Sequence, residues 1–461
     1  MAEPAQVVVV GGGISGLACA ARLQQLGVPV TLFEANDRVG GLIQTVEQNG
    51  FLFESGPQSF QGTPTLLGLI RDLGIESELC TANPRAPRYV LRHGRLQKIP
   101  MSPQAVLTTS LLGVGSRWKV VSEAFRKTKP PDEEETIGQF VRRKFGHEIL
   151  EYLVSPFVSG VYAGDPERLS LRAAFPSLDE WEREYGSVLR GAMKSRGGNG
   201  ESKSAPPLCS FRRGIATLLH AIAAKLGDRL QTNARVEAVA RADGQPSNGF
   251  QIRLARKDGT DTLAAKAIVI AAPAHVASHL VAPFGSGIAQ KLSGIAYASL
   301  AVVGSGYYKK QTGMDLDGFG VLIPRSEKHR TLGIVWNSSL FPGRAPEGQM
   351  TLTSFTGGAT DPEIARRSEP EISAIVQKDH EEILGITGSP IVSKVWIHHK
   401  ALPQYNLGHG HVVETLREAE RSIAGLFFAG NYLEGPSIGK CVERAFQTAE
   451  AAQKFVQSAA S

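Results

Sequence analysis

A short glycine-rich stretch near the start of the chain has the residue types and spacing of a phosphate-binding loop. It reads Gly11-Gly12-Gly13-Ile14-Ser15-Gly16 and follows the apolar run Val7 to Val10. Gly11 permits a sharp turn, Gly13 lets the backbone approach a pyrophosphate, and Gly16 lets a helix pack close to a strand. A helix that starts in this loop would offer free N–H groups to the phosphates of a dinucleotide.

The segments around the loop supply the elements that must position it. We expect a helix rich in Ala and Leu after Gly16, and a second apolar run, Val28 to Phe33, ends on Glu34. An acid roughly 20 residues after such a loop can accept hydrogen bonds from a ribose diol. The order strand, loop, helix, strand and acid therefore predicts a dinucleotide-binding unit rather than a glycine loop that only connects two elements.

The residues after Glu34 narrow the dinucleotide to a flavin. The pattern E-x-x-x-R-x-G-G, with Arg38, Gly40 and Gly41, resembles the second half of a fingerprint shared by FAD-dependent amine oxidases, carotene desaturases and protoporphyrinogen oxidases. This resemblance implies non-covalently bound FAD rather than NAD. It also implies that Arg38 lies near a phosphate or ribose of the cofactor and that the twin glycines let the chain pass close to the flavin.

Two later segments resemble further parts of the same FAD domain. The resemblance implies that the backbone at Val236, in an expected edge strand, contacts the adenine end of FAD, and that Trp396 backs the cofactor site. The resemblance also places the start of a helix expected over Cys441 to Ser458 against the flavin ring, where the helix N-terminus would stabilise the anionic reduced form. The cofactor-binding residues implied in this way are Gly11, Gly12, Gly13, Ile14, Ser15, Gly16, Glu34, Ala35, Arg38, Gly41, Leu42, Gly56, Pro57, Gln58, Ser59, Val236, Trp396, Gly430, Asn431, Pro436, Ser437 and Ile438.

Several local motifs are similar to one branch of this superfamily. Ser155 to Ser170 resembles the signature loop of the HemY-type protoporphyrinogen and coproporphyrinogen oxidases. Gly318 to Pro324 and Thr331 to Trp336 resemble their substrate-domain strands, and Pro403 to His409 matches their P-Q-Y-x-x-G-H run. The resemblances extend from residue 6 to about residue 450.

This resemblance implies an FAD-dependent enzyme that aromatises a porphyrinogen. Three two-electron steps would pass hydride from a meso carbon to flavin N5, with dioxygen as the acceptor and hydrogen peroxide as the second product. The protein would supply binding, orientation and a dry site, while the flavin carries the chemistry. Protoporphyrinogen IX is the expected substrate, and coproporphyrinogen III stays open because one sequence does not locate the extra cation that its additional carboxylates would need.

The residues expected at the substrate follow from the same resemblance. Arg88 would pair with a propionate in a bidentate fashion, and Gln58 would lie at the reacting end of the flavin, where the family often has Asn or Arg. Trp336 would stack on a pyrrole ring. The full implied set is Arg88, Gln58, Gly160, Phe319, Leu322 and Trp336.

No acid–base pair or metal site is predicted. The sequence shows no Ser-His-Asp set, no carboxylate pair and no metal-ligand spacing, so we name no general base and expect no metal. The histidines considered as proton acceptors are each expected to be structural; they are His275, His398, His399, His409 and His411.

Residues 105–125 form a candidate membrane contact. Leu111, Val114, Trp118, Val121 and Phe125 recur at helical spacing, with Arg117, Lys119, Arg126 and Lys127 close by. A basic helix with an aromatic stripe can lie in a membrane interface. The alternative is a helix that packs on its own domain.

The composition and motifs give no indication of a nucleic-acid-binding protein. The chain has 461 residues, 42% hydrophobic residues and a net charge of +6, and it contains no nucleic-acid-binding motif. Its four cysteines are far apart, which fits a reducing compartment. The first strand begins by residue 7, so we expect no signal or transit peptide and a location in the cytoplasm or on the inner face of the cell membrane. A monomer or homodimer is expected.

We predict an α/β fold, α+β overall, in three parts. A Rossmann-like FAD-binding domain comprises residues 1–86, 209–278 and 416–461, a helical and membrane-associated domain comprises 87–208, and an antiparallel-sheet substrate domain comprises 279–415. Residues 194–207 are polar and rich in Gly, Ser and Pro, so we expect a flexible loop.

Two further classes stay open. An amine oxidase or carotenoid desaturase would need a lysine at flavin N5 and an aromatic cage, neither of which can be placed. A carrier without redox activity, like the Rab-escort relatives, would bind no flavin.

Overall fold

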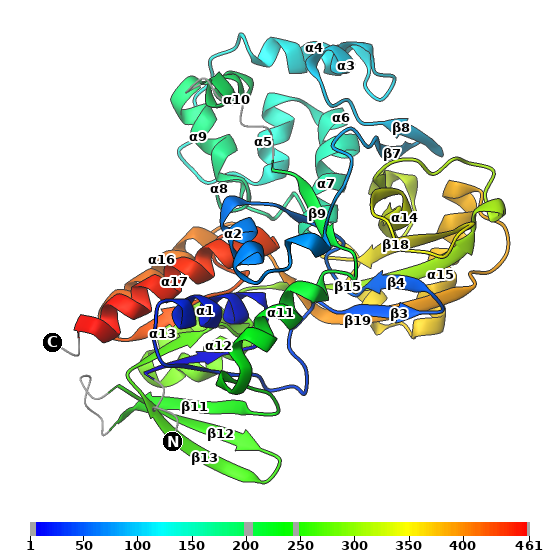
Figure 1. Cartoon of the computed structure of the whole chain (residues 1–461). Coiled ribbons are helices and arrows are strands. Elements are labelled where there is room, and N and C mark those ends of the chain that lie inside the picture. Colours follow the sequence, from blue (N-terminus) through cyan, green and yellow to red (C-terminus); the bar gives the residue numbers. More distant parts are fainter. Residues whose placement is uncertain (1–5, 198–205, 243–248, 459–461) are drawn as a thin grey trace.

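The computed structural model describes residues 6–197, 206–242 and 249–458 (Figure 1). The strands, in chain order, are β1 Val7–Val10, β2 Val30–Phe33, β3 Thr45–Gln48, β4 Phe51–Glu54, β5 Phe60–Gln61, β6 Leu79–Thr81, β7 Arg88–Arg92, β8 Arg95–Lys98, β9 Leu208–Phe211, β10 Leu230–Gln231, β11 Arg235–Arg241, β12 Phe250–Arg256, β13 Gly259–Ala265, β14 Ala267–Ile270, β15 Tyr297–Tyr308, β16 Gly320–Leu322, β17 Thr331–Val335, β18 Gln349–Gly357, β19 Val392–Pro403 and β20 Leu426–Phe428. The helices are α1 Ile14–Gln25, α2 Pro64–Asp72, α3 Pro103–Thr108, α4 Val114–Glu123, α5 Ile137–Lys144, α6 His147–Ile149, α7 Ser155–Tyr162, α8 Leu171–Ala174, α9 Pro176–Tyr185, α10 Val188–Gly197, α11 Ala216–Leu226, α12 Ala274–Val281, α13 Ser286–Ser293, α14 Asn337–Leu340, α15 Glu369–Leu384, α16 His409–Ser422 and α17 Ile438–Ser458.

The first unit is a parallel sheet with the order β10-β2-β1-β14-β20. Its central strand, β1, is buried on both faces: Val7 and Val9 pack with α1, α11 and α17, while Val8 and Val10 pack with the β11–β13 meander and α12. A parallel strand covered on both faces reads as a continuous apolar run, as Val7 to Val10 does. The expected Rossmann-like unit is confirmed, and it is assembled from three separate segments of the chain.

The second unit is a seven-stranded sheet with the order β19-β15-β18-β17-β16-β7-β8. Its pairs are antiparallel except for β16 and β7, which run parallel. The substrate-domain strands expected within Gly318 to Pro324 and Thr331 to Trp336 are present as β16 and β17. The helix α15 lies on one face of this sheet, where Ile383 and Leu384 pack against Val321 and Ile334.

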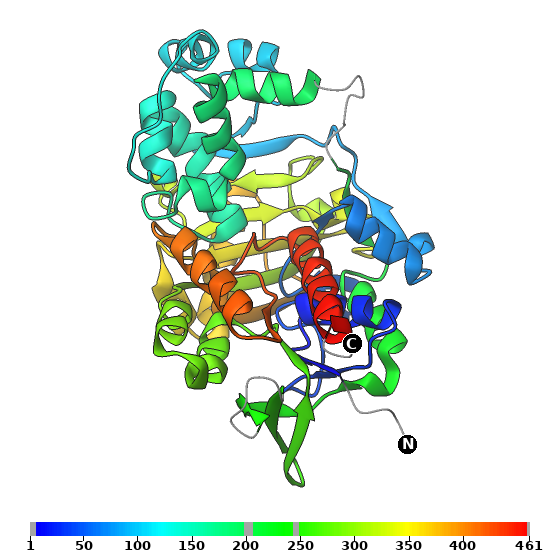
Figure 2. The same ribbon diagram turned by 90° about the vertical axis from the view of Figure 1, so that its left-hand side faces the viewer.

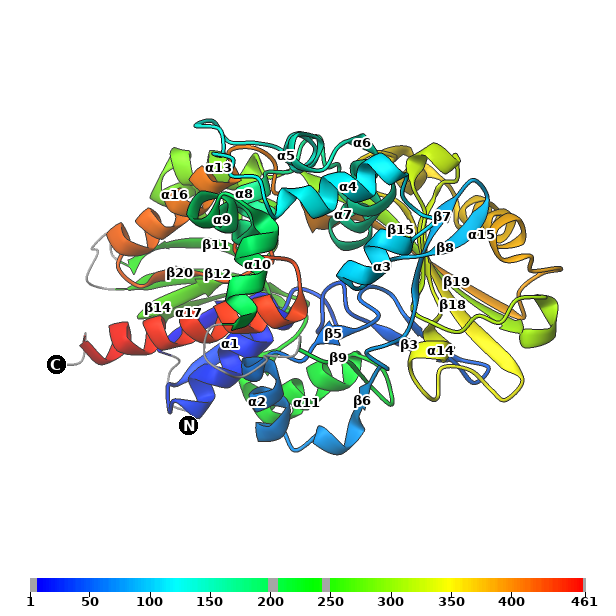
Figure 3. The same ribbon diagram turned by 90° about the horizontal axis from the view of Figure 1, so that it is seen from above.

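Helices α3 to α10 form a third, helical region at one end of the molecule (Figure 2). They surround a core that includes Phe140, Leu150 and Val158, and Leu322 of the large sheet packs against that core. Viewed from above, the parallel sheet and the seven-stranded sheet lie side by side beneath this helical region (Figure 3).

The large sheet extends further than the predicted domain boundaries. Residues 88–98, assigned from sequence to the helical part, form β7 and β8 and join the sheet through β16, with Gly320 in register with Arg88. A pairing between segments more than 200 residues apart depends on tertiary register, which the local pattern of this basic hairpin does not encode.

The single helical stripe expected from Leu111 to Phe125 is wrong in part. The chain breaks between α3 and α4, and Leu111 and Leu112 turn into the core of the helical region. The amide of Gly113, which caps α4, donates to Glu148. The stripe therefore starts at Val114, and Phe125 follows the end of α4.

The expected loop at 194–207 is also only partly tested. Residues 194–197 are the end of α10, so that part of the prediction is wrong, while 198–205 lie outside the described residues.

Candidate active site

The glycine loop has the geometry that its residue types predict. Gly11 has a φ of +109°, and its amide donates to the carbonyl of Phe33 at 2.8 Å. A Cβ on Gly16 would lie 1.9 Å from the carbonyl oxygen of Gly11, so the close approach of α1 to β1 requires glycine there. A Cβ on Gly13 would meet nothing within 4 Å, so the backbone at the start of α1 has open space beside it.

The carboxylate of Glu34 lies beside this loop. It is buried and accepts hydrogen bonds from the amide of Gly12 at 2.6 Å and from the amide and side chain of Asn36 at 2.8 and 2.6 Å. A carboxylate offers about four acceptor positions, so capacity for a further donor remains. The start of β11 also lies beside Glu34, because the amide of Ala234 donates to the carbonyl of Glu34 at 2.9 Å. Val236 follows in β11, with its side chain in the core.

The loop that contains Arg38 packs against the glycine loop. The amide of Gly40 donates to the carbonyl of Gly12 at 2.8 Å, and the guanidinium of Arg38 donates to the carbonyl of Gly41 at 2.8 Å. A Cβ on Gly41 would lie 3.7 Å from the Cα of Gly13, so these two glycines face each other. Segments 11–16 and 38–43 therefore form two sides of one cradle.

The C-terminal glycine-rich turn meets the first segment at the start of α17. A Cβ on Gly439 would lie 2.9 Å from Cγ2 of Thr63, whose buried hydroxyl has no partner. The turn itself is held by Tyr405, whose hydroxyl donates to the carbonyl of Asn431 at 2.5 Å and accepts from the amide of Gly435 at 2.8 Å. The helix starts at Ile438, three residues earlier than the sequence predicts.

The segment from Glu54 to Ser59 connects the cradle to the large sheet. Ser55 donates its hydroxyl to the carbonyl of Leu42 at 2.9 Å, and Nε2 of His398 donates to the carbonyl of Ser55 at 2.8 Å. Gln58 is buried, donates to the carbonyl of Gly56 at 2.8 Å and accepts from Nδ2 of Asn337 at 2.7 Å. We call this segment, Glu54 to Ser59, the predicted flavin loop. It is thus fixed to β19 and to the start of α14.

One face of the large sheet gathers most of the predicted substrate residues. Arg88 is in register with Gly320, so Arg88 and Leu322 lie on the same face. The guanidinium of Arg88 lies 5.2 Å from the centre of the Phe319 ring. The helix α7 covers Leu322, since a Cβ on Gly160 would lie 3.1 Å from Cδ2 of that leucine. Four of the six predicted substrate residues therefore lie around β16, namely Arg88, Phe319, Leu322 and Gly160.

Trp336 differs from the expectation for it. Its side chain is 2% exposed and packs with Val321 and Ile334 on the face covered by α15, with its ring 5.3 Å from that of Tyr89. Successive residues of a strand point to opposite faces, and this alternation places Trp336 with Ile334 rather than with Gly333. Stacking of Trp336 on a substrate remains a prediction that would require the ring to be uncovered.

Trp396 lies on the opposite face of the large sheet from Trp336. It is in register with Val302 on β15 and packs with Phe355, next to His398 on the same strand. It also contacts the cluster of Phe51 and Phe53 that precedes the flavin loop. This position agrees with a side chain that supports the loop from behind.

Three of the five candidate histidines have a pKa lowered by burial, which favours the neutral imidazole. Burial lowers the pKa of His409 to about 4, against a smaller opposing effect of its hydrogen bond to the Tyr432 carbonyl. Burial also lowers the pKa of His398 and of His275. His398 is the histidine that touches the flavin loop, and its role there is a hydrogen bond to backbone.

The cradle fits a dinucleotide. Its floor carries no side chain at Gly13, and its acid, Glu34, stands beside the glycine loop. The description "flavin containing amine oxidoreductase" belongs to the family model that matches residues 14–453. The chain belongs to this family. FAD is accordingly its cofactor, and the protein is an FAD-dependent oxidoreductase.

Individual relatives narrow the family. The chain is 35% identical to a chloroplastic protoporphyrinogen oxidase 1 from Arabidopsis thaliana, over 97% of this chain and 88% of that protein. It is 29% identical to a coproporphyrinogen III oxidase from Bacillus subtilis, over 95% and 96%. A crystal structure from Exiguobacterium, provisionally named protoporphyrinogen oxidase, has the same fold with a TM-score of 0.82, 23% identity and coverage of 98% and 99%. The chain is therefore a member of the protoporphyrinogen oxidase family.

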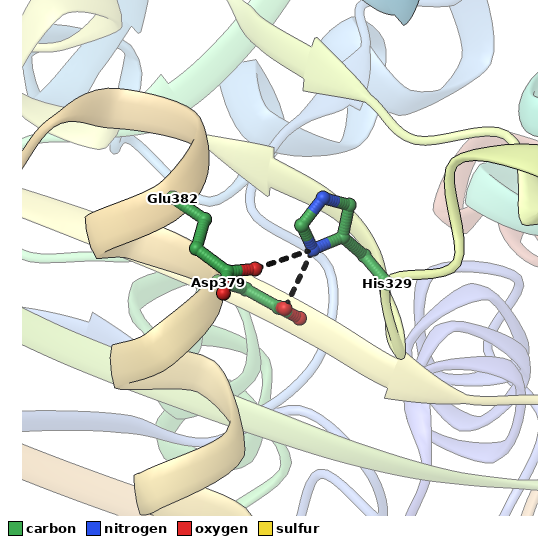
Figure 4. Close-up of side chains that lie close together, drawn as sticks. All are labelled: His329, Asp379 and Glu382. Carbon is green, nitrogen blue, oxygen red and sulfur yellow. Dashed lines mark hydrogen bonds and ion pairs between the residues drawn. The ribbon is translucent and has the colours of Figure 1, made fainter. Parts of the chain in front are cut away.

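Three potential metal ligands come together away from this site. His329, Asp379 and Glu382 have ligand atoms that all lie within 4.8 Å of one another, and no other group of this kind occurs in the described ranges 6–197, 206–242 and 249–458 (Figure 4). The expectation of no metal site came from sequence spacing alone, which does not bring a loop residue next to a helix.

Several contributors to the site were missed from the sequence. Asn337 had no signal beyond its place after the aromatic position, and its Oδ1 is buried without a partner. Phe157 and Val161 on α7 are 46% and 41% exposed beside Gly160, and their presence in the signature loop was the available signal. Tyr405 belongs to the P-Q-Y-x-x-G-H run, but the run itself does not indicate its contacts with Asn431 and Gly435.

Proposed function

We propose that this enzyme oxidises protoporphyrinogen IX to protoporphyrin IX, with dioxygen as the acceptor. The reaction consumes three molecules of dioxygen and forms three of hydrogen peroxide, so six hydrogens leave the macrocycle. The observation that carries the proposal is the grouping of Arg88, Phe319 and Leu322 around β16, with Leu322 packed under Gly160 of α7. The same face of the sheet bears His398, which donates to the predicted flavin loop. Relatives named protoporphyrinogen oxidase support this proposal.

FAD, when bound, accepts two electrons at a time as hydride and is reoxidised by dioxygen. The chain itself positions the substrate. Arg88 is exposed on the site face, and a planar guanidinium can hold a propionate through two parallel hydrogen bonds. Its position over the Phe319 ring keeps the cation beside an apolar surface that a flat macrocycle can cover.

Apolar residues provide the walls. Leu322 lies under Gly160, while Phe157 and Val161 expose apolar surface on the same helix. Surfaces of this kind would exclude water from the reacting carbon. Gln58 is held by Asn337 and Gly56, so the loop that we assign to the reacting end of the flavin is fixed before the substrate arrives.

No side chain is assigned as a general base. The neutral histidines His398 and His409 both use Nε2–H for backbone hydrogen bonds. Pyrrolic protons would therefore leave to solvent.

The test is an assay of the purified holoenzyme under air. We would follow porphyrin fluorescence after adding protoporphyrinogen IX or, separately, coproporphyrinogen III. A higher kcat/KM for protoporphyrinogen supports the proposal. A higher value for coproporphyrinogen would overturn it in favour of the activity that the Bacillus subtilis relative is named for, and oxidation of neither would reject both.

We also propose that the helical region contacts a membrane surface. Val114, Trp118 and Phe125 are 75%, 68% and 83% exposed, and Arg117 and Lys119 accompany them. The helices α3 and α4 lie at the outer end of the molecule (Figures 1 and 3). Among the described helices, none is long and apolar enough to cross a bilayer. We propose that this contact is peripheral and lies on the cytoplasmic face of the membrane.

Deletion of residues 105–125 would remove the buried Leu111 and Leu112 and so disturb the fold. The sharper test substitutes Trp118 and Phe125 with Ser and measures co-sedimentation with vesicles that contain anionic lipid. Loss of co-sedimentation with unchanged melting temperature supports the contact. Unchanged co-sedimentation of the folded variant contradicts it.

A further inference from the structure

The cluster of His329, Asp379 and Glu382 lies on the side of the large sheet covered by α15. His329 stands just before β17, and Asp379 and Glu382 are three residues apart on α15. Residues at this spacing share one face of a helix, and Figure 4 shows both carboxylates directed at the imidazole. Nδ1 of His329 is 2.8 Å from Oδ1 of Asp379 and 3.7 Å from Oε2 of Glu382.

Nδ1 of His329 cannot donate a hydrogen bond to both Asp379 and Glu382. If Nδ1 carries its proton, that proton reaches Asp379, and Glu382 at 3.7 Å is beyond a hydrogen bond. The other ion pair of Glu382 within the described chain, to Lys378, is also 3.7 Å long. Within the described residues, the half-exposed carboxylate of Glu382 therefore faces the imidazole without a hydrogen bond to protein and with one side open to solvent.

A small divalent ion would satisfy all three groups. Zinc binds imidazole nitrogen and carboxylate oxygen at about 2.0–2.2 Å, so ligand atoms in a tetrahedral site lie roughly 3.4 Å apart. The separations of 2.8 and 3.7 Å from Nδ1 fall on either side of that spacing. The three ligand atoms lie within 4.8 Å of one another, so side-chain rotations would bring them around one ion, with water as the fourth ligand.

The cluster also has an outer support. Oδ2 of Asp379 accepts a hydrogen bond from the amide of Thr331 at 3.0 Å, which orients the carboxylate with Oδ1 toward the imidazole. Backbone or carboxylate partners commonly orient metal ligands in this way. Asp379 is buried, whereas Glu382 is exposed, so an ion could enter from solvent on the Glu382 side.

We propose that His329, Asp379 and Glu382 bind a zinc ion. The ion would join the start of β17 to α15 and so stabilise the sheet that carries the substrate face. The site is separate from the FAD cradle and does not take part in the redox reaction.

The experiment is a calorimetric titration of Zn²⁺ into untagged FAD-loaded enzyme treated first with chelator. We expect one site, and Glu382→Gln should weaken its Kd by about tenfold or more, because a ligand is lost. The matched control is Glu381→Gln, which makes the same charge change one residue away on the same helix and should leave the Kd unchanged. FAD content, read from the visible spectrum, should be equal in all three proteins.

A second measurement covers the case in which calorimetry shows several weak sites. Zn²⁺ should raise the melting temperature of the original enzyme and of Glu381→Gln but not that of Asp379→Asn, whose amide oxygen can still accept from Thr331. Equal Zn²⁺ responses in all variants, or no binding to the original enzyme at millimolar Zn²⁺, would overturn the proposal and leave the cluster as an ion pair.

Discussion

The side chains of Gln58 and Asn337 form a buried hydrogen bond of 2.7 Å that joins the predicted flavin loop to the start of α14, which follows β17 of the large sheet. The two residues are 279 positions apart in the chain. The orientation of the Gln58 amide is fixed, because its Nε2 already donates to the carbonyl of Gly56 and its oxygen is left to accept from Asn337. This bond makes the position of the loop depend on the position of the substrate-bearing sheet.

We expect Gln58→Ala and Asn337→Ala each to lower the free energy of unfolding by about 1–3 kcal/mol, because each leaves a buried partner unsatisfied. In a double-mutant cycle measured by chemical denaturation of the holoenzyme, the two losses should not add. Additive losses would show that the bond carries no coupling.

Arg88→Ala should raise the KM for protoporphyrinogen IX by about tenfold or more, since a charge-assisted pair with a propionate is lost. FAD content should not change. Arg88→Lys should recover only part of the loss because lysine lacks the planar fork. The control is Arg85→Ala, an exposed neighbour, and a normal KM in Arg88→Ala would place the carboxylate contact elsewhere.

Tyr405→Phe removes the hydroxyl that bridges Asn431 and Gly435 in the glycine-rich turn. The loss of two hydrogen bonds, one to a buried amide, should weaken FAD binding roughly tenfold. Quenching of FAD fluorescence on titration into apoprotein measures this affinity. Tyr308→Phe, at an exposed position, serves as the comparison. An unchanged FAD affinity in Tyr405→Phe would mean that the turn keeps its shape without the bridge.

Trp336→Phe should lower the melting temperature while leaving the KM for the porphyrinogen unchanged, because the indole is packed in the core under α15. Deleting part of a buried aromatic side chain costs packing and leaves a cavity. The opposite pattern, a several-fold higher KM with an unchanged melting temperature, would show that the ring is uncovered and stacks on the substrate.

The unfolding free energy should fall as the pH is lowered from about 6.5 toward 4. Burial lowers the pKa of His380 and of His409 to about 4 in the folded chain, while an unfolded histidine titrates near 6.5. Between these values the unfolded chain binds more protons, so stability is complete above about pH 6.5 and is lost as the pH falls. His380→Gln should reduce the steepness of this dependence measured by urea unfolding, and His411→Gln at an exposed position should not.

Local features were predictable because their causes are local. The close packing of Gly16 and the position of Glu34 follow from a strand, a turn and a helix that are adjacent in the chain. The apolar run of β14 follows in the same way from burial on both faces of its sheet. The family motifs added the cofactor and the substrate class, which composition and periodicity alone do not specify.

The sequence by itself therefore predicted the glycine loop with its acid and the presence of an antiparallel sheet in the substrate domain. The assignment of Arg88 and Leu322 to the substrate came from the family motifs and stays a prediction. Only the tertiary structure decided that β7 and β8 join the large sheet, that Trp336 points to the covered face, and that Gln58 meets Asn337. The same holds for the convergence of His329 with α15. Each of these depends on the register between segments far apart in the chain, and a shift of one residue in a strand would reverse which side chains face the site.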